Sequence, residues 1–90
     1  MIVLVTYDLK QPDRNYDALY AAIKQSGTVW WHYLESVWLI RTEMTPAQCF
    51  DRIHPNMDEN DSLFIVDISH KPHQGWLPKD AWEWIKTNDV

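Results

Sequence analysis

The chain opens with an apolar strand followed by an amphipathic helix. Residues 2–8 are almost entirely aliphatic or β-branched and end before Pro12, which predicts a strand. Apolar side chains then recur at the spacing of one helix face, at Tyr16, Leu19, Tyr20 and Ile23. Gly27 is expected to end this helix at the position where a left-handed backbone is favoured.

The middle of the chain predicts a β-hairpin and a second helix. Residues 29–33 and 36–40 are rich in aromatic and β-branched residues, with a turn expected at 34–35. The next helix has a capping box, Thr45 with Gln48.

The same helix is expected to bury Phe50 and Ile53 and to end before Pro55. An acidic surface loop, residues 56–61, follows, and residues 63–68 predict a fourth strand.

This order of elements predicts an α+β fold, the ferredoxin-like βαββαβ arrangement with a four-stranded antiparallel sheet. Right-handed crossovers place the first and third strands in the centre and the fourth and second at the edges. We assign residues 1–69 to this domain. Residues 70–90 form a Trp-rich C-terminal tail, irregular over 70–75 and helical over 78–86, which we expect to pack on the sheet or on a dimer partner.

Both faces of the predicted sheet are apolar. Every residue in the range 2–5 is aliphatic, and successive side chains of a strand point to opposite faces. Two helices cover only one face, and a face left in water is normally polar. The second face therefore needs the tail, a second copy of the chain, or both. We expect a homodimer packed face to face, with the tail at its rim. Its expected interface residues are Trp38, Ile40, Trp76 and Trp82.

Composition indicates the cellular compartment and the kinds of partner to expect. A domain of 90 residues has a marginal core unless a partner extends it. Eight basic and 13 acidic residues give a net charge of -5, and the basic ones are scattered, which argues against strong nonspecific nucleic-acid binding. The single Cys49 cannot form an internal disulfide and fits a reducing compartment. No apolar run reaches the roughly 20 residues of a membrane span. We expect a cytoplasmic protein with no membrane contact.

Short segments of residues 1–68 carry a resemblance to a known family. They are Tyr7-Asp8-Leu9 at the end of the first strand, the helix closing at Gly27, and Ser36-Val37-Trp38 at the start of the third strand. Together they resemble the small CRISPR-associated adaptation subunit of antiviral defence, a family that includes VapD-like toxin nucleases and SinR-like bacterial relatives. The resemblance implies a ferredoxin-like dimer. Its members either cleave RNA or DNA with a metal or bridge the integrase subunits of a spacer-acquisition complex.

The resemblance implies that Asp8 is the catalytic residue and metal ligand, facing its copy across a two-fold axis. The sheet order places the end of the first strand beside the starts of the third and fourth, so Asp8 should lie near Ser36 and near residues 61–62. Two close carboxylates would repel unless a cation lay between them, and Mg²⁺ suits such a site. The alternative is that Asp8 caps the turn at residues 9–13.

The same match makes Tyr7, Lys10, Arg14 and Ser36 candidate substrate-binding residues. The family has a basic stretch after the aspartate and a Gln before the Ser-Val-aromatic segment. Here residues 10–14 are only modestly basic, and Glu35 precedes Ser36. Both differences reduce affinity for phosphate and favour a protein partner.

Three functions remain open at this point: a non-catalytic dimeric adaptor that binds protein or nucleic acid, a Mg²⁺-dependent endonuclease that uses Asp8, and a toxin-like component.

Two other groups of potentially reactive residues give weaker indications of a functional site. His70 and His73 have a ligand-like gap but no third zinc ligand at a suitable spacing. Cys49, on the second predicted helix with His54 five residues later, is interpreted as a core-packing residue and not as part of a nucleophile pair.

Overall fold

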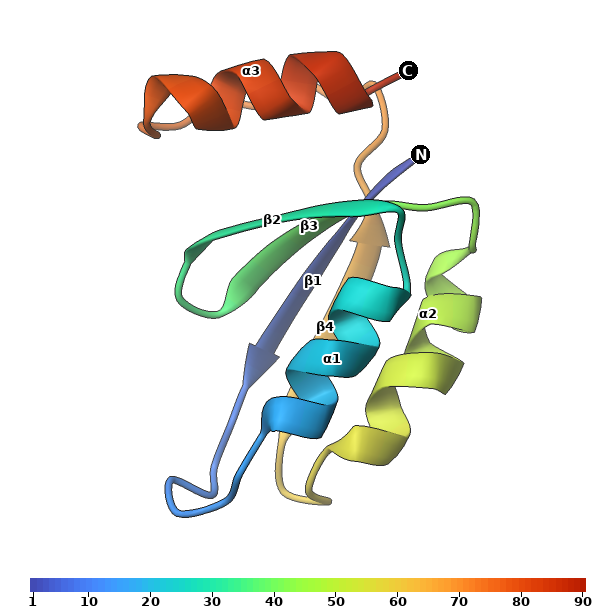
Figure 1. The fold of residues 1–90 in the computed structure, drawn as a ribbon, viewed down its shortest axis with the longest axis vertical. Coiled ribbons are helices and arrows are strands. Elements are labelled where there is room, and N and C mark those ends of the chain that lie inside the picture. The colour runs from blue at the N-terminus through green and yellow to red at the C-terminus, as the bar shows by residue number, and fades with distance from the viewer.

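The computed structural model describes all 90 residues and has the predicted order of elements, with a third helix in the tail (Figure 1). The strands are β1 (Ile2–Asp8), β2 (Val29–Leu34), β3 (Val37–Arg41) and β4 (Ser62–Asp67), and the helices are α1 (Asp17–Gln25), α2 (Pro46–Ile53), the 3₁₀ turn η1 (His54–Asn56) and α3 (Lys79–Asn88). The strands pair antiparallel in the order β2-β3-β1-β4. The ferredoxin-like arrangement, with the first and third strands central, is confirmed. No helix is long and apolar enough to cross a bilayer.

The hairpin turn lies one residue later than predicted. Glu35 and Ser36 form the turn, because β2 continues to Leu34 through a shift in register between Trp31 and Leu34. Such a bulge places an extra residue on one strand and increases the local twist. The third strand therefore opens at Val37.

Gly27 follows α1 as predicted, but the reason given for it was wrong. No glycine has a positive φ, so Gly27 does not supply a left-handed turn. A Cβ atom there would lie 2.6 Å from the main-chain oxygen of Arg41 and 3.0 Å from Cβ of Ile40. Glycine is needed because α1 ends tightly against β3.

Helices α1 and α2 cover one face of the sheet. Side chains from β1 and β3 meet both helices in a core that holds Val3, Val5, Tyr7, Tyr16, Leu19, Ile23, Trp38, Ile40, Cys49 and Ile53. The capping box of Thr45 and Gln48 is present at the start of α2, as predicted. Phe50 was expected in this core, but it is 41% exposed and stacks on His54. Cys49 is buried in its place.

The opposite face is apolar as well, as the sequence predicts, and α3 lies over one end of it. Ile2, Leu39, Trp31 and Ala81 form a second core, against which Leu4, Ile68, Leu77, Trp84 and Ile85 pack. Figure 1 shows α3 near the beginning of β1, far from the end of β1 that carries Asp8. The tail therefore covers only part of this face.

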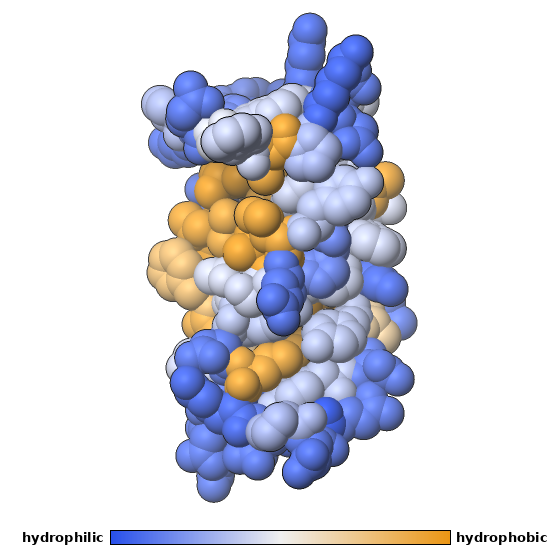
Figure 2. All heavy atoms as spheres, turned by 90° about the vertical axis from the view of Figure 1, so that its left-hand side faces the viewer, coloured by the Kyte–Doolittle hydropathy of each residue, from blue (hydrophilic) through white to orange (hydrophobic).

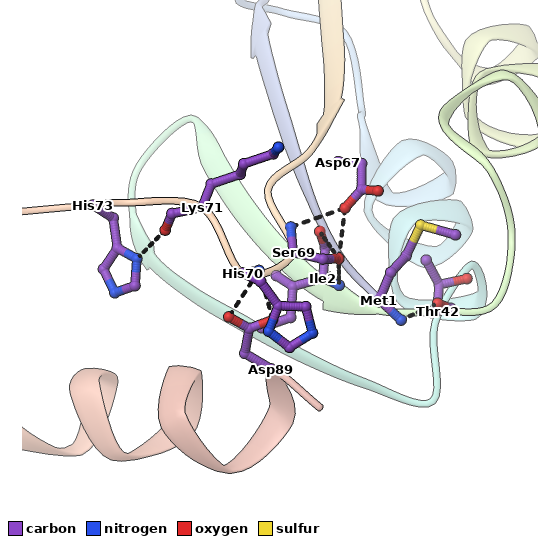
Figure 3. Close-up of polar contacts among 9 residues, drawn as sticks. All are labelled: Met1, Ile2, Thr42, Asp67, Ser69, His70, Lys71, His73 and Asp89. Atoms are coloured by element: carbon purple, nitrogen blue, oxygen red, sulfur yellow. Dashed lines mark hydrogen bonds and ion pairs between the residues drawn. The ribbon is translucent and has the colours of Figure 1, made fainter.

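The tail is fixed at its base by polar contacts (Figure 3). The hydroxyl of Ser69 accepts the Ile2 amide at 2.9 Å. The Asp89 carboxylate, beyond the end of α3, accepts the His70 amide at 3.0 Å. His70 has φ 56°, the only positive φ in the chain. The tail is thus a closed hairpin, in which residues 70–78 run out from the sheet and α3 returns.

The position of Gly27 gives a test of the tight contact between α1 and β3. We expect Gly27→Ala to lower the free energy of unfolding by about 1–3 kcal/mol, because the new methyl group would press on main-chain atoms that cannot move aside. Gly75→Ala is the matched control, since its Cβ would meet only the Trp82 side chain at 3.6 Å. Urea unfolding of the two variants measures the difference. Equal stabilities would contradict this account of Gly27.

Candidate functional site

Asp8 ends β1 on the face that α1 and α2 do not cover. Its Cα pairs with that of Ser62 on β4, and Asp8 and Ser36 line one polar crevice, so both predicted neighbours are confirmed. The side chain of Asp8 is 65% exposed. Its carboxylate lies 2.7 Å from Nζ of Lys10, and this pairing raises the pKa of Lys10.

The interpretation of Asp8 as a turn cap is wrong, because its carboxylate accepts no main-chain hydrogen bond. Asp61 has that role instead. It accepts the Lys10 amide at 2.7 Å, the Asp58 amide at 2.9 Å and the Tyr16 hydroxyl at 2.9 Å. Burial of the carboxylate opposes its ionisation, but these hydrogen bonds outweigh it and hold the pKa of Asp61 below its usual value.

Sequence reasoning missed this role and treated residues 56–61 as a plain acidic loop. The available signal was the pair Asp58 and Asp61, three residues apart, which is a turn spacing. Asp61 is therefore a structural residue that joins the loop after β1 to the loop before β4.

The predicted substrate-binding residues do not form one site. Tyr7 is buried, its hydroxyl accepts a hydrogen bond from Trp38 Nε1 at 3.0 Å, and burial raises its pKa. Arg14 contacts the Asp58 carboxylate at 3.4 Å, away from Asp8. Lys10 and Ser36 remain at the surface on either side of Asp8. The two cations nearest the site are thus each paired with a carboxylate.

Asp8 has few potential metal ligands beside it within one chain. No three His, Cys, Asp or Glu side chains are grouped so that they could hold a metal ion. Mg²⁺ is bound in proteins by one or two carboxylates together with waters and substrate phosphates. The Asp8 carboxylate is already paired with the Lys10 ammonium group, and Glu35 is the other acidic residue that lines its crevice.

The two other groupings are not ligand sets either. Nδ1 of His70 lies 3.5 Å from the Asp89 carboxylate, and Nδ1 of His73 contacts the Lys71 carbonyl at 2.9 Å, so the two rings have separate partners. Cys49 is buried in the helix-side core, and burial raises the pKa of its thiol.

The four predicted dimer residues fall into two groups. Trp38 and Ile40 are 2% and 0% exposed and belong to the core beneath α1 and α2. Their placement at a dimer interface is therefore wrong, because neither has surface left for a partner. The two tail residues are accessible: Trp76 is 100% exposed, and Trp82 is partly exposed and stacks on His73.

An uncovered apolar area remains on the sheet beside α3, which we call the open half-face. The strand registers place six further side chains on this face, either beside the four buried residues of the second core or at their border. They are Leu4, Thr6, Leu34, Val37, Phe64 and Val66. Phe64 is 63% exposed and Leu34 is 46% exposed. Figure 2 shows hydrophobic side chains gathered below α3 on the side of the molecule away from α2. Asp8 lies on the same face, next to this area.

A groove continues from the open half-face under the tail. It has a volume of about 150 Å³ and is lined by 13 residues, ten of them hydrophobic. Leu4, Leu34 and Val37 form its floor, and Leu77 and Trp82 come from the tail. Trp31 also lines the groove, and its buried Nε1 has no hydrogen-bond acceptor.

No protein-family model matches this chain, and no curated protein sequence is significantly similar to it. What the chain does is therefore inferred from its own residues and fold.

The low pKa of Asp61 predicts a specific acid dependence of stability. A carboxyl group with a lowered folded-state pKa stabilises the fold above its unfolded value of 3.8 and loses this effect as pH falls through the folded-state pKa. We expect Asp61→Asn to lower the thermal unfolding midpoint by a few degrees at pH 7, and the difference from wild type to close below pH 3.8. Thermal unfolding followed by circular dichroism between about pH 2 and pH 7 measures this difference, because that range spans the ordinary carboxyl pKa.

Asp13→Asn is the control for this test, because the exposed Asp13 has no hydrogen bond or ion pair. A constant difference between wild type and Asp61→Asn across the whole acid range would show that the carboxylate charge is not what holds the two loops together.

Proposed function

We propose that this protein is a non-catalytic adaptor that forms a homodimer through its open half-face. The observation that carries the proposal is the apolar surface on a sheet that the tail covers only in part, with Phe64 and Leu34 exposed and Val37 partly exposed. Phe64 lies on the edge strand β4, where it pairs with Thr6 of the central strand β1. A soluble monomer rarely exposes such an area unless another molecule covers it.

The total surface area of the chain supports the same proposal. It exposes 5999 Å². A compact monomer of 10.7 kDa is expected to expose about 5,500 Å². The excess of about 500 Å² is less than the roughly 800 Å² that one partner contributes to a standard interface, and it corresponds to a small one. A second copy is favoured because a two-fold axis lets one apolar area cover its equal.

An adaptor role is favoured over nucleic-acid cleavage by the charges. The net charge is -5, and the two basic residues of the segment after Asp8, Lys10 and Arg14, are paired with Asp8 and Asp58. Few basic groups are left to neutralise phosphates, which supply most of nonspecific nucleic-acid affinity. The resemblance to the small CRISPR-associated adaptation subunit fits a bridging role between protein partners. The lone buried Cys49 fits action in the cytoplasm.

The proposed dimer predicts a large effect of Phe64 on self-association. We expect Phe64→Ser to weaken the dimer at least about tenfold, because the most exposed apolar side chain of the open half-face is lost from the interface. Phe50→Ser is the matched control: Phe50 is similarly exposed, but it lies on α2, on the other side of the molecule. Sedimentation velocity over a dilution series measures both. A wild-type chain that stays monomeric at high concentration would refute the proposal, as would equal weakening by both substitutions.

A second candidate function is a Mg²⁺-dependent endonuclease of RNA or DNA, and a toxin-like component would share this chemistry. One observation favours it: Asp8 is exposed on the face through which we propose that the dimer forms. Association through this face would place one Asp8 from each copy at or beside the interface. The candidate uses both of these carboxylates, as the family resemblance implies.

Cleavage assays separate the two candidate functions. If the endonuclease proposal holds, labelled RNA or duplex DNA is cut in the presence of Mg²⁺, and Asp8→Asn lowers the rate about a hundredfold or more. Asp13→Asn, a change of the same kind at an exposed position five residues away, should cut normally. If the dimer cuts neither substrate, the endonuclease proposal is refuted and the adaptor proposal stands. Equal cutting by Asp8→Asn and wild type would identify a contaminating nuclease.

A further inference from the structure

We infer that Trp76 of each copy enters the groove beneath the tail of the other copy and locks the homodimer. This inference rests on the proposed homodimer and names the residues that complete its interface. The groove of one chain would then be filled only when the second chain contributes a side chain to it.

Trp76 is the clearest unpartnered side chain of the molecule. It is 100% exposed, although the chain has apolar surface close by. It stands in the irregular segment of residues 70–78, between Gln74 and Leu77, which both line the groove. An indole ring carries a large apolar area, and tryptophan is enriched where proteins meet. An indole held fully in water is therefore placed to bind a partner.

The groove has the chemistry that an aromatic side chain needs and room for at least one ring. Its volume is about 150 Å³, and its walls are mainly aliphatic and aromatic. A closed apolar cavity of about 150 Å³ accepts a benzene ring in another protein. The larger indole would fill this groove and reach its open mouth. The Trp76 ring of the same chain is not in it, since that side chain is fully exposed. The occupant that the structure offers is the same side chain of a second copy.

The Trp31 indole is a second sign that the groove is incomplete in one chain. Its Nε1 is buried at less than 1 Å² and has no acceptor. A buried donor without a partner is costly, and native structures contain few of them. Association with the segment around Trp76 of the second copy would shift the tail enough to bring a main-chain carbonyl group to this nitrogen.

The arrangement also meets the requirement of two-fold symmetry. In such a dimer the same patch serves both copies, so the projecting residue and its receiving groove must lie on one surface. Trp76 is flanked by groove residues, and Leu4, Leu34 and Val37 belong to both the groove and the open half-face. The Trp76 contact would therefore extend the interface already proposed, without a second binding surface.

Dimer affinity measures this contact directly. We expect Trp76→Ala to raise the dissociation constant of the dimer about tenfold or more and Trp76→Phe to raise it less, because a smaller ring fills part of the groove. Lys71→Ala, an exposed change in the same segment, should leave it unchanged. Sedimentation velocity gives the constants. Thermal unfolding at low concentration checks that the monomer of each variant is folded. We expect the Trp76 variants to be as stable as wild type, because the side chain is fully exposed in its own chain.

Free indole provides an independent test. We expect indole to compete for the groove, so that it weakens the wild-type dimer and leaves the already weaker Trp76→Ala dimer unchanged. Groove filling by Gln74→Trp, at a groove residue outside the open half-face, should weaken the wild-type dimer but add little in the Trp76→Ala background, as for two residues in contact. Additive effects of these two substitutions would overturn the inference.

The outcomes distinguish this inference from the proposed dimer. If Trp76→Ala dimerises as tightly as wild type while Phe64→Ser does not, the dimer stands and the role of Trp76 is overturned. If wild-type dimer binds indole without dissociating, the groove is a small-molecule site that the partner leaves open, which also overturns the inference. A wild-type chain without any dimer would end both proposals.

Discussion

The structure depends on a four-stranded sheet whose two faces are both apolar. Alternation along β1 sends Val3 and Val5 toward α1 and α2 and sends Ile2 and Leu4 to the other side. Two short helices can cover only the first of these faces. The second face must therefore be covered by the rest of the chain or by a partner. The tail covers part of it and leaves the remainder exposed.

The tail is a partial solution to this requirement. Helix α3 places Ala81 and Ile85 over one end of the second face, and Asp89 ties the end of the helix to His70 at the base of the tail. The end of the sheet that carries Asp8 stays uncovered. The exposed Phe64 and Leu34 belong to the area that we propose a second copy covers, because a contiguous apolar area of a sheet is rarely left in water.

The sequence predicted the elements, the strand order and the two apolar faces, because periodicity and handedness determine these locally. It did not predict which face Trp38 and Ile40 occupy, since a strand that is apolar on both sides carries no signal of direction. The antiparallel register settles it by pairing Val5 with Trp38. A usable signal was present in β1, where Thr6 and Asp8 share a parity and mark the wetter face.

The predicted site was found only in part, for a related reason. Proximity of Asp8 to Ser36 and Ser62 follows from strand order and was predictable, whereas the pairing of Lys10 with Asp8 depends on the conformation of the loop after β1. That loop is set by Asp61, which is remote in sequence and whose hydrogen bonds no local pattern reveals. Because Asp8 and Phe64 share one face, assembly and any chemistry at Asp8 are physically linked: the side chains that would bring two copies together also determine how near their carboxylates come.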